Sequence, residues 1–149
     1  MRMYAQAQGK LLDTASLSKQ KYHTMAEALK NPNKVYHLSV LSDDINEFNK
    51  QIGKFRNLQM LTCSENDIAS LPSDIWKLTN IQILDFSFNK LSKIPDDIGK
   101  LVHLKEFSCR GNSISNLPTG FYNLSKSEIL DISENQFSSF LETIKNLKI

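Results

Sequence analysis

The sequence of 149 residues has little of what marks several protein classes. Its two cysteines, Cys63 and Cys109, are too few for a disulfide framework. The net charge of +2 comes without a cluster of lysine and arginine, so nucleic acid is not an expected partner. No apolar run approaches the length of a membrane span. What is present is a chain with 40% apolar and 23% charged residues, long enough for one domain with a core.

The N-terminal segment 1–23 leaves two interpretations open. Ala5-Gln6-Ala7 resembles the small-x-small cleavage site of a secretory signal, but too few residues precede it for a working signal. The segment is therefore either the remnant of a longer targeting signal or a disordered terminus. The first interpretation implies an exported, cell-envelope protein, and the second implies a cytoplasmic one.

Residues 24–34 are expected to form a short helix and a turn. Thr24 followed by Glu27 fits a capping box, in which the hydroxyl accepts from a free N–H and the glutamate reaches back to another. Asn31 and Pro32 end the helix, because asparagine tolerates the left-handed conformation and proline cannot continue a helix. We therefore predict an N-terminal capping helix from about residue 24 to 30, followed by a turn into the first strand.

From residue 35 onward, the sequence aligns with itself at a shift of 23 residues without a gap. The five units begin at residues 35, 58, 81, 104 and 127. Two of the aligned apolar sets are Leu38, Leu61, Leu84, Phe107, Leu130 and Val40, Cys63, Phe86, Cys109, Ile132. A polar set follows, with Asp43 in the first unit and then Asn66, Asn89, Asn112 and Asn135. Such an alignment over residues 35–149 is hard to obtain by chance, so the repeat decides the fold.

The unit matches L-x-x-L-x-L-x-x-N-x-L-x-x-L-P-x-x-I-x-x-L. The chain thus resembles the leucine-rich repeat family, in its 23-residue class with a Leu-Pro signature. The resemblance covers about three quarters of the chain. It implies an α/β fold: a right-handed solenoid of strands and α or 3-10 segments, with a parallel sheet on the concave face. It says less about function, because the same scaffold hosts many roles.

Local chemistry agrees with this resemblance. Leu61 and Cys63, two positions apart, lie on the inner face of a short strand. The asparagines follow the strands, where a side-chain amide can satisfy buried backbone groups, so stacked units are expected to form an asparagine ladder. Pro72 and Pro95 can start the return segment. Strands stack at about 4.8 Å and packed helical turns at up to about 10 Å, so the array curves with the strands inside.

Strand residues that point away from the core are expected to line the concave face. The predicted partner-binding residues are His37, Leu41, Met60, Ile83, Asp85, Phe88, Glu106, Arg110, Ile129 and Asp131. Core formation does not require Met60, Ile83, Ile129 or Phe88 at exposed places. Apolar residues close to charged ones suit a protein or peptide partner. The alternative is that strand propensity alone favours isoleucine at these positions.

Catalysis and metal binding have much weaker support. Asp85 and Asp131 would lie about 10 Å apart, near the upper spacing of an inverting glycosidase pair. However, their row faces open solvent, with no apolar pocket to raise one pKa. The three histidines have no partner at metal-ligand spacing, and no phosphate loop or nucleophile elbow is present. We therefore expect no catalytic residue, no metal and no cofactor.

The C-terminal unit lacks the polar cap that a solenoid needs. Its apolar residues, among them Leu130, Ile132, Phe137 and Phe140, would face an unpaired edge strand. This predicts further repeats or an end-to-end association with another chain. Leu141 in the place of proline is instead typical of a final unit that caps itself.

The sequence as a whole predicts a protein–protein interaction module that binds a protein or peptide and has no enzymatic chemistry of its own. The alternative is the recognition part of a longer regulatory enzyme, whose GTPase, kinase or ligase domain lies outside these residues.

Overall fold

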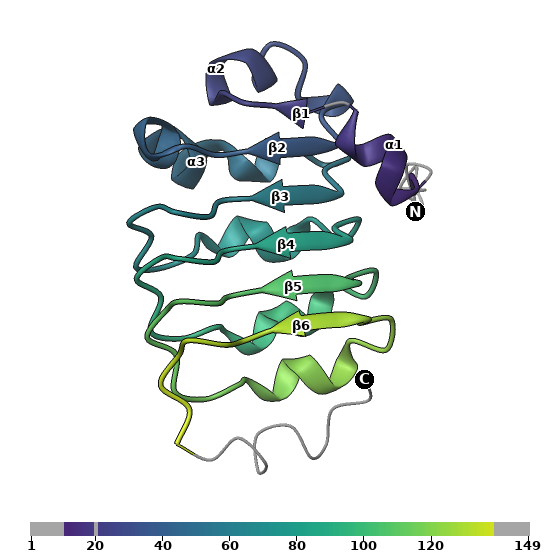
Figure 1. Cartoon of the computed structure of the whole chain (residues 1–149). Coiled ribbons are helices and arrows are strands. Elements are labelled where there is room, and N and C mark those ends of the chain that lie inside the picture. The colour runs from purple at the N-terminus through teal and green to yellow at the C-terminus, as the bar shows by residue number, and fades with distance from the viewer. Residues whose placement is uncertain (1–10, 20, 139–149) are drawn as a thin grey trace, which may run out of the picture.

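The computed structural model describes residues 11–19 and 21–138. Within them, six short strands form one open parallel sheet in chain order, and short helices return the chain between strands (Figure 1). The strands are β1 (Lys21–Tyr22), β2 (His37–Ser39), β3 (Met60–Thr62), β4 (Ile83–Asp85), β5 (Glu106–Ser108) and β6 (Ile129–Asp131). The α-helices are α1 (Thr14–Ser18), α2 (Met25–Ala28) and α3 (Ile45–Gln51). The 3-10 helices are η1 (Pro32–Lys34), η2 (Ser42–Asp44), η3 (Ile52–Lys54), η4 (Ser73–Lys77), η5 (Asp96–Lys100) and η6 (Thr119–Asn123).

The sheet has the 23-residue register that the sequence predicts. Met60 pairs with His37 on one side and with Ile83 on the other, and the same row continues through Glu106 to Ile129. Successive strands are neighbours throughout the sheet, so each unit packs on the units before and after it. The predicted repeat solenoid with a parallel sheet is confirmed.

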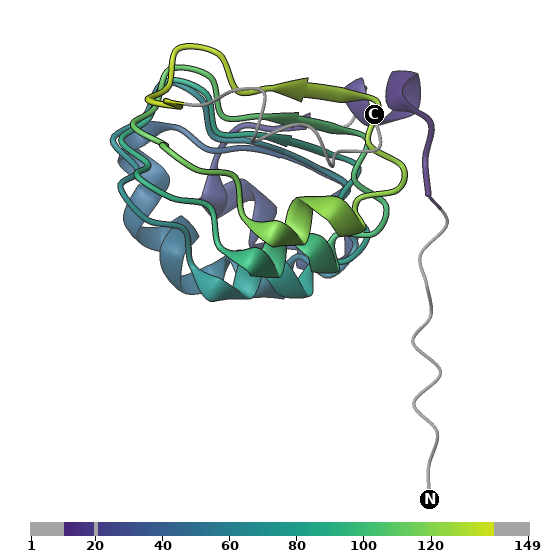
Figure 2. The ribbon, with the colours of Figure 1, turned by 90° about the horizontal axis from the view of Figure 1, so that it is seen from below.

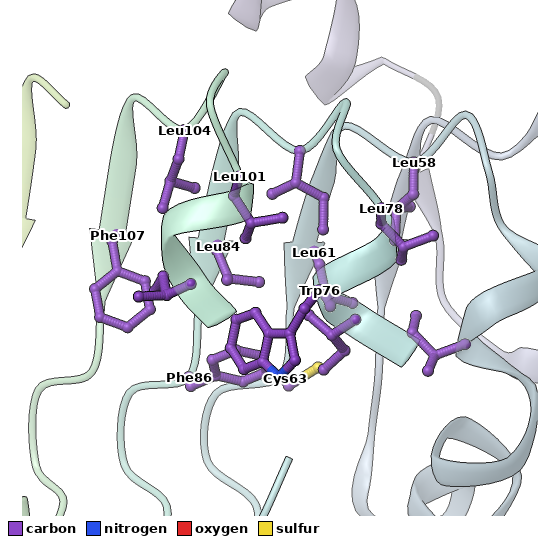
Figure 3. Close-up of a cluster of buried hydrophobic side chains, with 14 of the residues drawn as sticks. Leu58, Leu61, Cys63, Trp76, Leu78, Leu84, Phe86, Leu101, Leu104 and Phe107 are labelled. Atoms are coloured by element: carbon purple, nitrogen blue, oxygen red, sulfur yellow. The ribbon is translucent and has the colours of Figure 1, made fainter. Parts of the chain in front are cut away.

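The core fills the space between the sheet and the returning helical segments (Figure 2). Leu61, Leu84 and Phe107, at equivalent strand positions, are each at most 1% exposed. They lie opposite Leu78 and Leu101, which follow η4 and η5 (Figure 3). Burying one such side chain contributes about 1.5–3 kcal/mol, so repeated rows of them stabilise a stack of strands that are individually too short to stand alone.

The return segments of the later units begin at prolines. Pro72, Pro95 and Pro118 each stand directly before a 3-10 helix, with φ between −74° and −66°. A proline at this place sacrifices no intrahelical hydrogen bond, because a first-turn N–H has no partner within the helix. In the first unit Asn49 takes the place of the proline, and the chain forms α3 through it. The first unit therefore returns through α3 followed by η3, whereas the second, third and fourth units each return through one 3-10 helix.

The asparagines that follow the strands hold neighbouring units together. In the third unit, Asn89 Nδ2 donates to the Cys63 carbonyl oxygen at 2.8 Å, and Oδ1 accepts from the Ile68 N–H at 2.9 Å. Both partners belong to the preceding unit. Asn112 and Asn135 make the corresponding bonds one and two units further along. Each asparagine thus satisfies backbone groups that no strand or helix partner reaches.

Asn66, in the second unit, makes an incomplete set of these bonds. Its Nδ2 donates to the carbonyl oxygens of Val40 and Cys63 at 3.1 and 3.0 Å. Its buried Oδ1 has no hydrogen-bond partner within the described residues. In the first unit, the N–H that corresponds to that of Ile68 belongs to Ile45, the first residue of α3. Asp43, which stands where the later units have asparagine, lies in η2. The helical backbone of the first unit accounts for the missing donor.

The N-terminal segment differs from its predicted form. The disordered alternative for 1–23 is wrong for residues 11–19 and 21–23, which contain α1 and β1. The alternative of a targeting remnant stays a prediction, and Ala5-Gln6-Ala7 lies outside the described residues. Asp13 caps α1 by accepting from the Ser16 N–H at 2.8 Å, and β1 adds a strand beside β2. The expected capping helix is present as α2, shorter than 24–30, with the Thr24 hydroxyl accepting from the Glu27 N–H.

Two further predictions concern membranes and the C-terminal end. Of the helices in residues 11–19 and 21–138, none is long and apolar enough to span a membrane. Ile132 is buried and Phe137 packs against the core, whereas Phe140 lies outside the described residues.

Candidate protein-interaction surface

The concave face is the surface of the sheet that points away from the 3-10 helices (Figure 2). Among the predicted binding residues, the exposed ones are Leu41, Phe88, Arg110 and Ile129. The half-buried ones are Met60, Asp85, Glu106 and Asp131. The exposed fractions of Leu41, Phe88 and Ile129 are 55%, 45% and 54%. Scattered exposed apolar side chains are ordinary, but three on or at the rim of one small face give that face an apolar character.

The backbone of Phe88 lies in the left-handed region, with φ of 53°. The equivalent residues of other units, Glu65, Gly111 and Glu134, have φ of 56°, 65° and 54°. The turn after each of these strands therefore requires a left-handed residue. Glycine adopts this conformation without a steric penalty, whereas an L side chain costs about 1–2 kcal/mol. A phenylalanine here carries that penalty and still leaves much of its ring in solvent.

The Phe88 ring is held in place by the next unit. It lies against Gly111, where an added Cβ would be 2.6 Å from the ring's Cδ1. The Arg110 guanidinium carbon is 5.6 Å from the ring centroid, within cation–π range. Arg110 Nη2 also donates to Glu134 Oε1 at 2.6 Å, and this bond raises the pKa of the guanidinium. We call Phe88, Arg110 and Glu134 the aromatic cluster.

Two carboxylates of the concave face are engaged by serines of their own units. Asp85 Oδ1 accepts from the Ser87 N–H at 2.8 Å and from the Ser87 hydroxyl. Asp131 accepts from the Ser133 N–H and hydroxyl at 3.0 and 2.5 Å, and the hydroxyl bond lowers the pKa of Asp131. These short-range turns satisfy the carboxylates locally. Asp85 and Asp131 act here as acceptors for turn donors, and the hydrogen bonds from Ser133 outweigh burial, so the pKa of Asp131 moves away from that of a general acid.

Two predicted binding residues are not exposed. His37 and Ile83 are only 3% and 7% exposed, so the expectation that they line an open surface is wrong. Residues 11–19, which we call the N-terminal strap, run along the edge of the sheet where the strands begin (Figure 1). The carbonyl of Leu17 lies 3.2 Å from His37 Nδ1, and the Leu17 side chain is 1% exposed. The strap thus lies against His37, and Leu12 is bonded to Gln82, the residue directly before Ile83.

The residues that hold the strap were missed by the sequence analysis. Gln59 and Gln82 are 0% and 3% exposed and occupy the same register position, one residue before β3 and β4. Gln59 Oε1 accepts from the Leu12 N–H at 2.8 Å, and Gln82 Nε2 donates to the Leu12 carbonyl at 2.8 Å. The same residue type recurring at a buried register position was the available signal. A buried amide requires a partner, and none is evident from the repeat alone.

The burial of the two cysteines and the grouping of the ionisable side chains in residues 11–19 and 21–138 bear on reactive and metal-binding chemistry. Cys63 and Cys109 are free and buried. Burial raises the pKa of the Cys109 thiol to about 12 and raises that of Cys63 well above its usual range. Both behave as small apolar core residues, as their register predicts. Across the part of the chain that the structure describes, no group of three or more His, Cys, Asp or Glu side chains is placed to hold a metal ion.

Comparisons with known proteins agree with the repeat architecture. The family described as leucine rich repeats (2 copies) matches residues 56–100. A comparison with curated proteins finds no match. Among solved structures, a leucine-rich repeat protein of Leptospira interrogans is 30% identical with a TM-score of 0.78, and the alignment covers 86% of this chain and 33% of that one.

Two internalins of Listeria monocytogenes are similar in fold alone. Each is 22% identical to this chain, with TM-scores of 0.64 and 0.62. The alignments cover 84% and 85% of this chain, and 36% and 65% of the internalins. The chain therefore spans only part of the length of each of these proteins.

Proposed function

Because the chain belongs to the leucine-rich repeat proteins, which generally serve as binding modules without enzymatic activity, we propose that it recognises a protein or peptide partner through the open part of its concave face. The proposed contact residues are Leu41, Phe88, Arg110 and Ile129, with Met60, Asp85, Glu106 and Asp131 around them. His37 and Ile83 stand outside this surface, because both are buried, His37 against the strap.

The observation that supports this proposal best is the state of Phe88. Its left-handed backbone costs about 1–2 kcal/mol, and 45% of the residue stays exposed although the ring packs against the next unit. Glu65 and Glu134 adopt the same backbone conformation, so the strain belongs to the turn, and the distinctive feature of Phe88 is a large apolar ring left half in solvent. The ring is nevertheless preorganised, because Gly111 leaves room for it and Arg110 lies over it. An ordered, half-exposed aromatic side chain beside an arginine has the composition of an interface hot spot.

The surroundings of Phe88 indicate the chemistry of the partner. Arg110 is already paired with Glu134, so the cluster presents an aromatic surface with a nearly balanced charge at its edge. Leu41 and Ile129 extend the apolar character toward the two ends of the sheet. Such a surface suits a partner with an apolar side chain that inserts at Phe88, surrounded by polar groups.

The test uses the unaltered whole chain and single-residue variants of it as baits. Phe88→Asn removes the ring but keeps a residue that tolerates the left-handed backbone. Tyr122→Asn is the matched control, because Tyr122 is an aromatic residue of similar exposure, 41%, on η6 away from the concave face. Proteins captured from an extract of the source cells are identified by mass spectrometry and retested with purified components.

We expect at least one partner to bind the unaltered chain and Tyr122→Asn equally, and to bind Phe88→Asn at least about tenfold more weakly, as for a hot-spot side chain. Arg110→Gln should also weaken binding of the same partner, because it removes the cation–π contact with Phe88. If every captured protein binds all the baits alike, the concave face around Phe88 is not the recognition surface.

A further inference from the structure

Gln59 and Gln82 together hold both main-chain groups of a single residue. Leu12 donates its N–H to Gln59 Oε1 and accepts at its carbonyl from Gln82 Nε2, each at 2.8 Å. Gln82 Nε2 also donates to Gln59 Oε1 at 3.0 Å, which fixes the two amides relative to each other. In an extended backbone, as in an antiparallel pair, the N–H and C=O of one residue point to the same side, so these two bonds suit an extended main chain. Both bonds go to the main chain of Leu12, and neither involves its side chain.

The strap depends on this site and on one side chain for its attachment. α1 has five residues, far fewer than an isolated helix needs to be stable in water. Leu17 is buried, whereas Leu11 is 36% exposed and most other residues of the strap are also exposed. Within residues 11–19, the contacts that attach the strap are those of the main chain of Leu12 and of the side chain and carbonyl of Leu17. Segments with so few buried contacts open locally at a small fraction of the free energy of global unfolding.

The strap covers residues of the proposed recognition face. Leu12 lies at Gln82, directly before Ile83, and Leu17 lies at His37, the first residue of β2. Both His37 and Ile83 are outward-pointing strand residues in the row of Met60, and both are nearly inaccessible to solvent. Release of the strap would expose an isoleucine, a histidine and two amides at the amino-terminal edge of the sheet. These would then be continuous with the open surface that carries Phe88.

We propose that Gln59 and Gln82 form a binding site for an extended peptide main chain, and that the N-terminal strap occupies this site in cis as an autoinhibitory segment. The partner supplies an extended main chain in the place of Leu12 and, a few residues further on, a leucine-like side chain in the place of Leu17, and its binding completes the concave surface. This proposal rests on the proposed function, because it regulates the same face.

The experiment requires no partner, so that its failure can be separated from failure of the proposed function. Leu17→Asp in the whole chain removes the buried anchor, and Leu11→Asp is the matched control at an exposed leucine of the same segment. Ile83→Cys, combined with each, reports whether the strap covers β4, because Cys63 and Cys109 are buried and remain unlabelled. The probe ligand is a synthetic peptide of residues 11–19, LLDTASLSK, followed through the NMR signals of the Gln59 and Gln82 side-chain amides.

We expect Leu17→Asp to raise the rate of thiol labelling at position 83 by about tenfold or more, and Leu11→Asp to leave it unchanged. The peptide, at concentrations near 1 mM or above, should shift the two amides in a saturable way only in Leu17→Asp, because in the other chains the tethered strap competes at a comparable effective concentration. Equal labelling in both variants, or no amide shift, would overturn the proposal.

A measurement on the unaltered chain covers the case in which Leu17→Asp does not fold. Amide hydrogen exchange should give residues 11–19 a lower free energy of opening than the strands β3 and β4. Mild denaturant should change the exchange rate of residues 11–19 less than it changes the rate of global unfolding. Exchange of the strap only through global unfolding would make it a fixed part of the core and would also overturn the proposal. Loss of binding in Phe88→Asn is an independent result and bears on the proposed function alone.

Discussion

Asn66 and Asn89 offer a nearly matched pair for measuring one buried hydrogen bond of the ladder. Both are buried to a similar degree, at 8% and 9% exposure, and each Nδ2 donates to three carbonyl oxygens. They differ at Oδ1, which accepts from the Ile68 N–H in Asn89 and has no partner among the described residues in Asn66. Asn89→Ala therefore leaves one more buried N–H unsatisfied than Asn66→Ala. Since such a group costs about 1–3 kcal/mol, we expect Asn89→Ala to be the less stable variant by about 2 kcal/mol.

Urea denaturation followed by circular dichroism measures this difference, provided that both variants keep the same m-value. Asn116→Ala is the control, because Asn116 is exposed and bonds only to the neighbouring Ser115 hydroxyl; its effect should stay within about 0.5 kcal/mol. If Asn66→Ala and Asn89→Ala destabilise the chain equally, or if Asn66→Ala costs more, the hydrogen bond from the Ile68 N–H to Asn89 does not stabilise the fold as argued.

Three further predictions concern single side chains. Gly111→Ala should destabilise the chain by about 1–2 kcal/mol, because alanine is strained at this φ and its Cβ displaces the Phe88 ring. A double-mutant cycle should show a smaller loss when Phe88→Asn is already present. Burial lowers the pKa of His37 below 6.5, so the unfolded chain takes up this proton first as the pH falls, and stability should decline below about pH 6.5; urea titrations should show a smaller decline for His37→Gln, and an unchanged one would contradict the burial of this imidazole. Cys63 and Cys109 should remain unlabelled by a thiol reagent at pH 8 until urea unfolds the chain, and labelling of the folded chain would mean that the core opens locally.

The repeat could be predicted closely because its signal is local and recurs. A strand of three residues with an asparagine after it gives the same pattern in the second to fifth units, so the register Met60, Ile83, Glu106 follows from spacing alone. The prolines of the second to fourth units likewise predict the return segments η4, η5 and η6, and Asn49, in the place of proline, lies within α3 of the first unit. These features depend on residues within one unit or in adjacent ones.

The burial of His37 and Ile83 could not be predicted in the same way. It depends on a contact between residue 12 and residue 82, which lie 70 positions apart and share no pattern. The strap carries no repeat signal, and α1 is too short for a clear helical period. The left-handed backbone of Phe88 was predictable in principle, because Gly111 occupies the same register position. The glycine at this position indicates a left-handed backbone, and the same backbone then follows for the equivalent residues of the other units.

The direction of the asparagine bonds has a mechanical consequence. Asn89, Asn112 and Asn135 each donate a hydrogen bond to a carbonyl of the preceding unit, so these bonds join each of the three units to the one before it. A force applied to the C-terminal side would load these hydrogen bonds one after another rather than all together. Pulled in this direction, the chain should lengthen in steps, each releasing one unit of 23 residues, or about 80 Å of extended backbone.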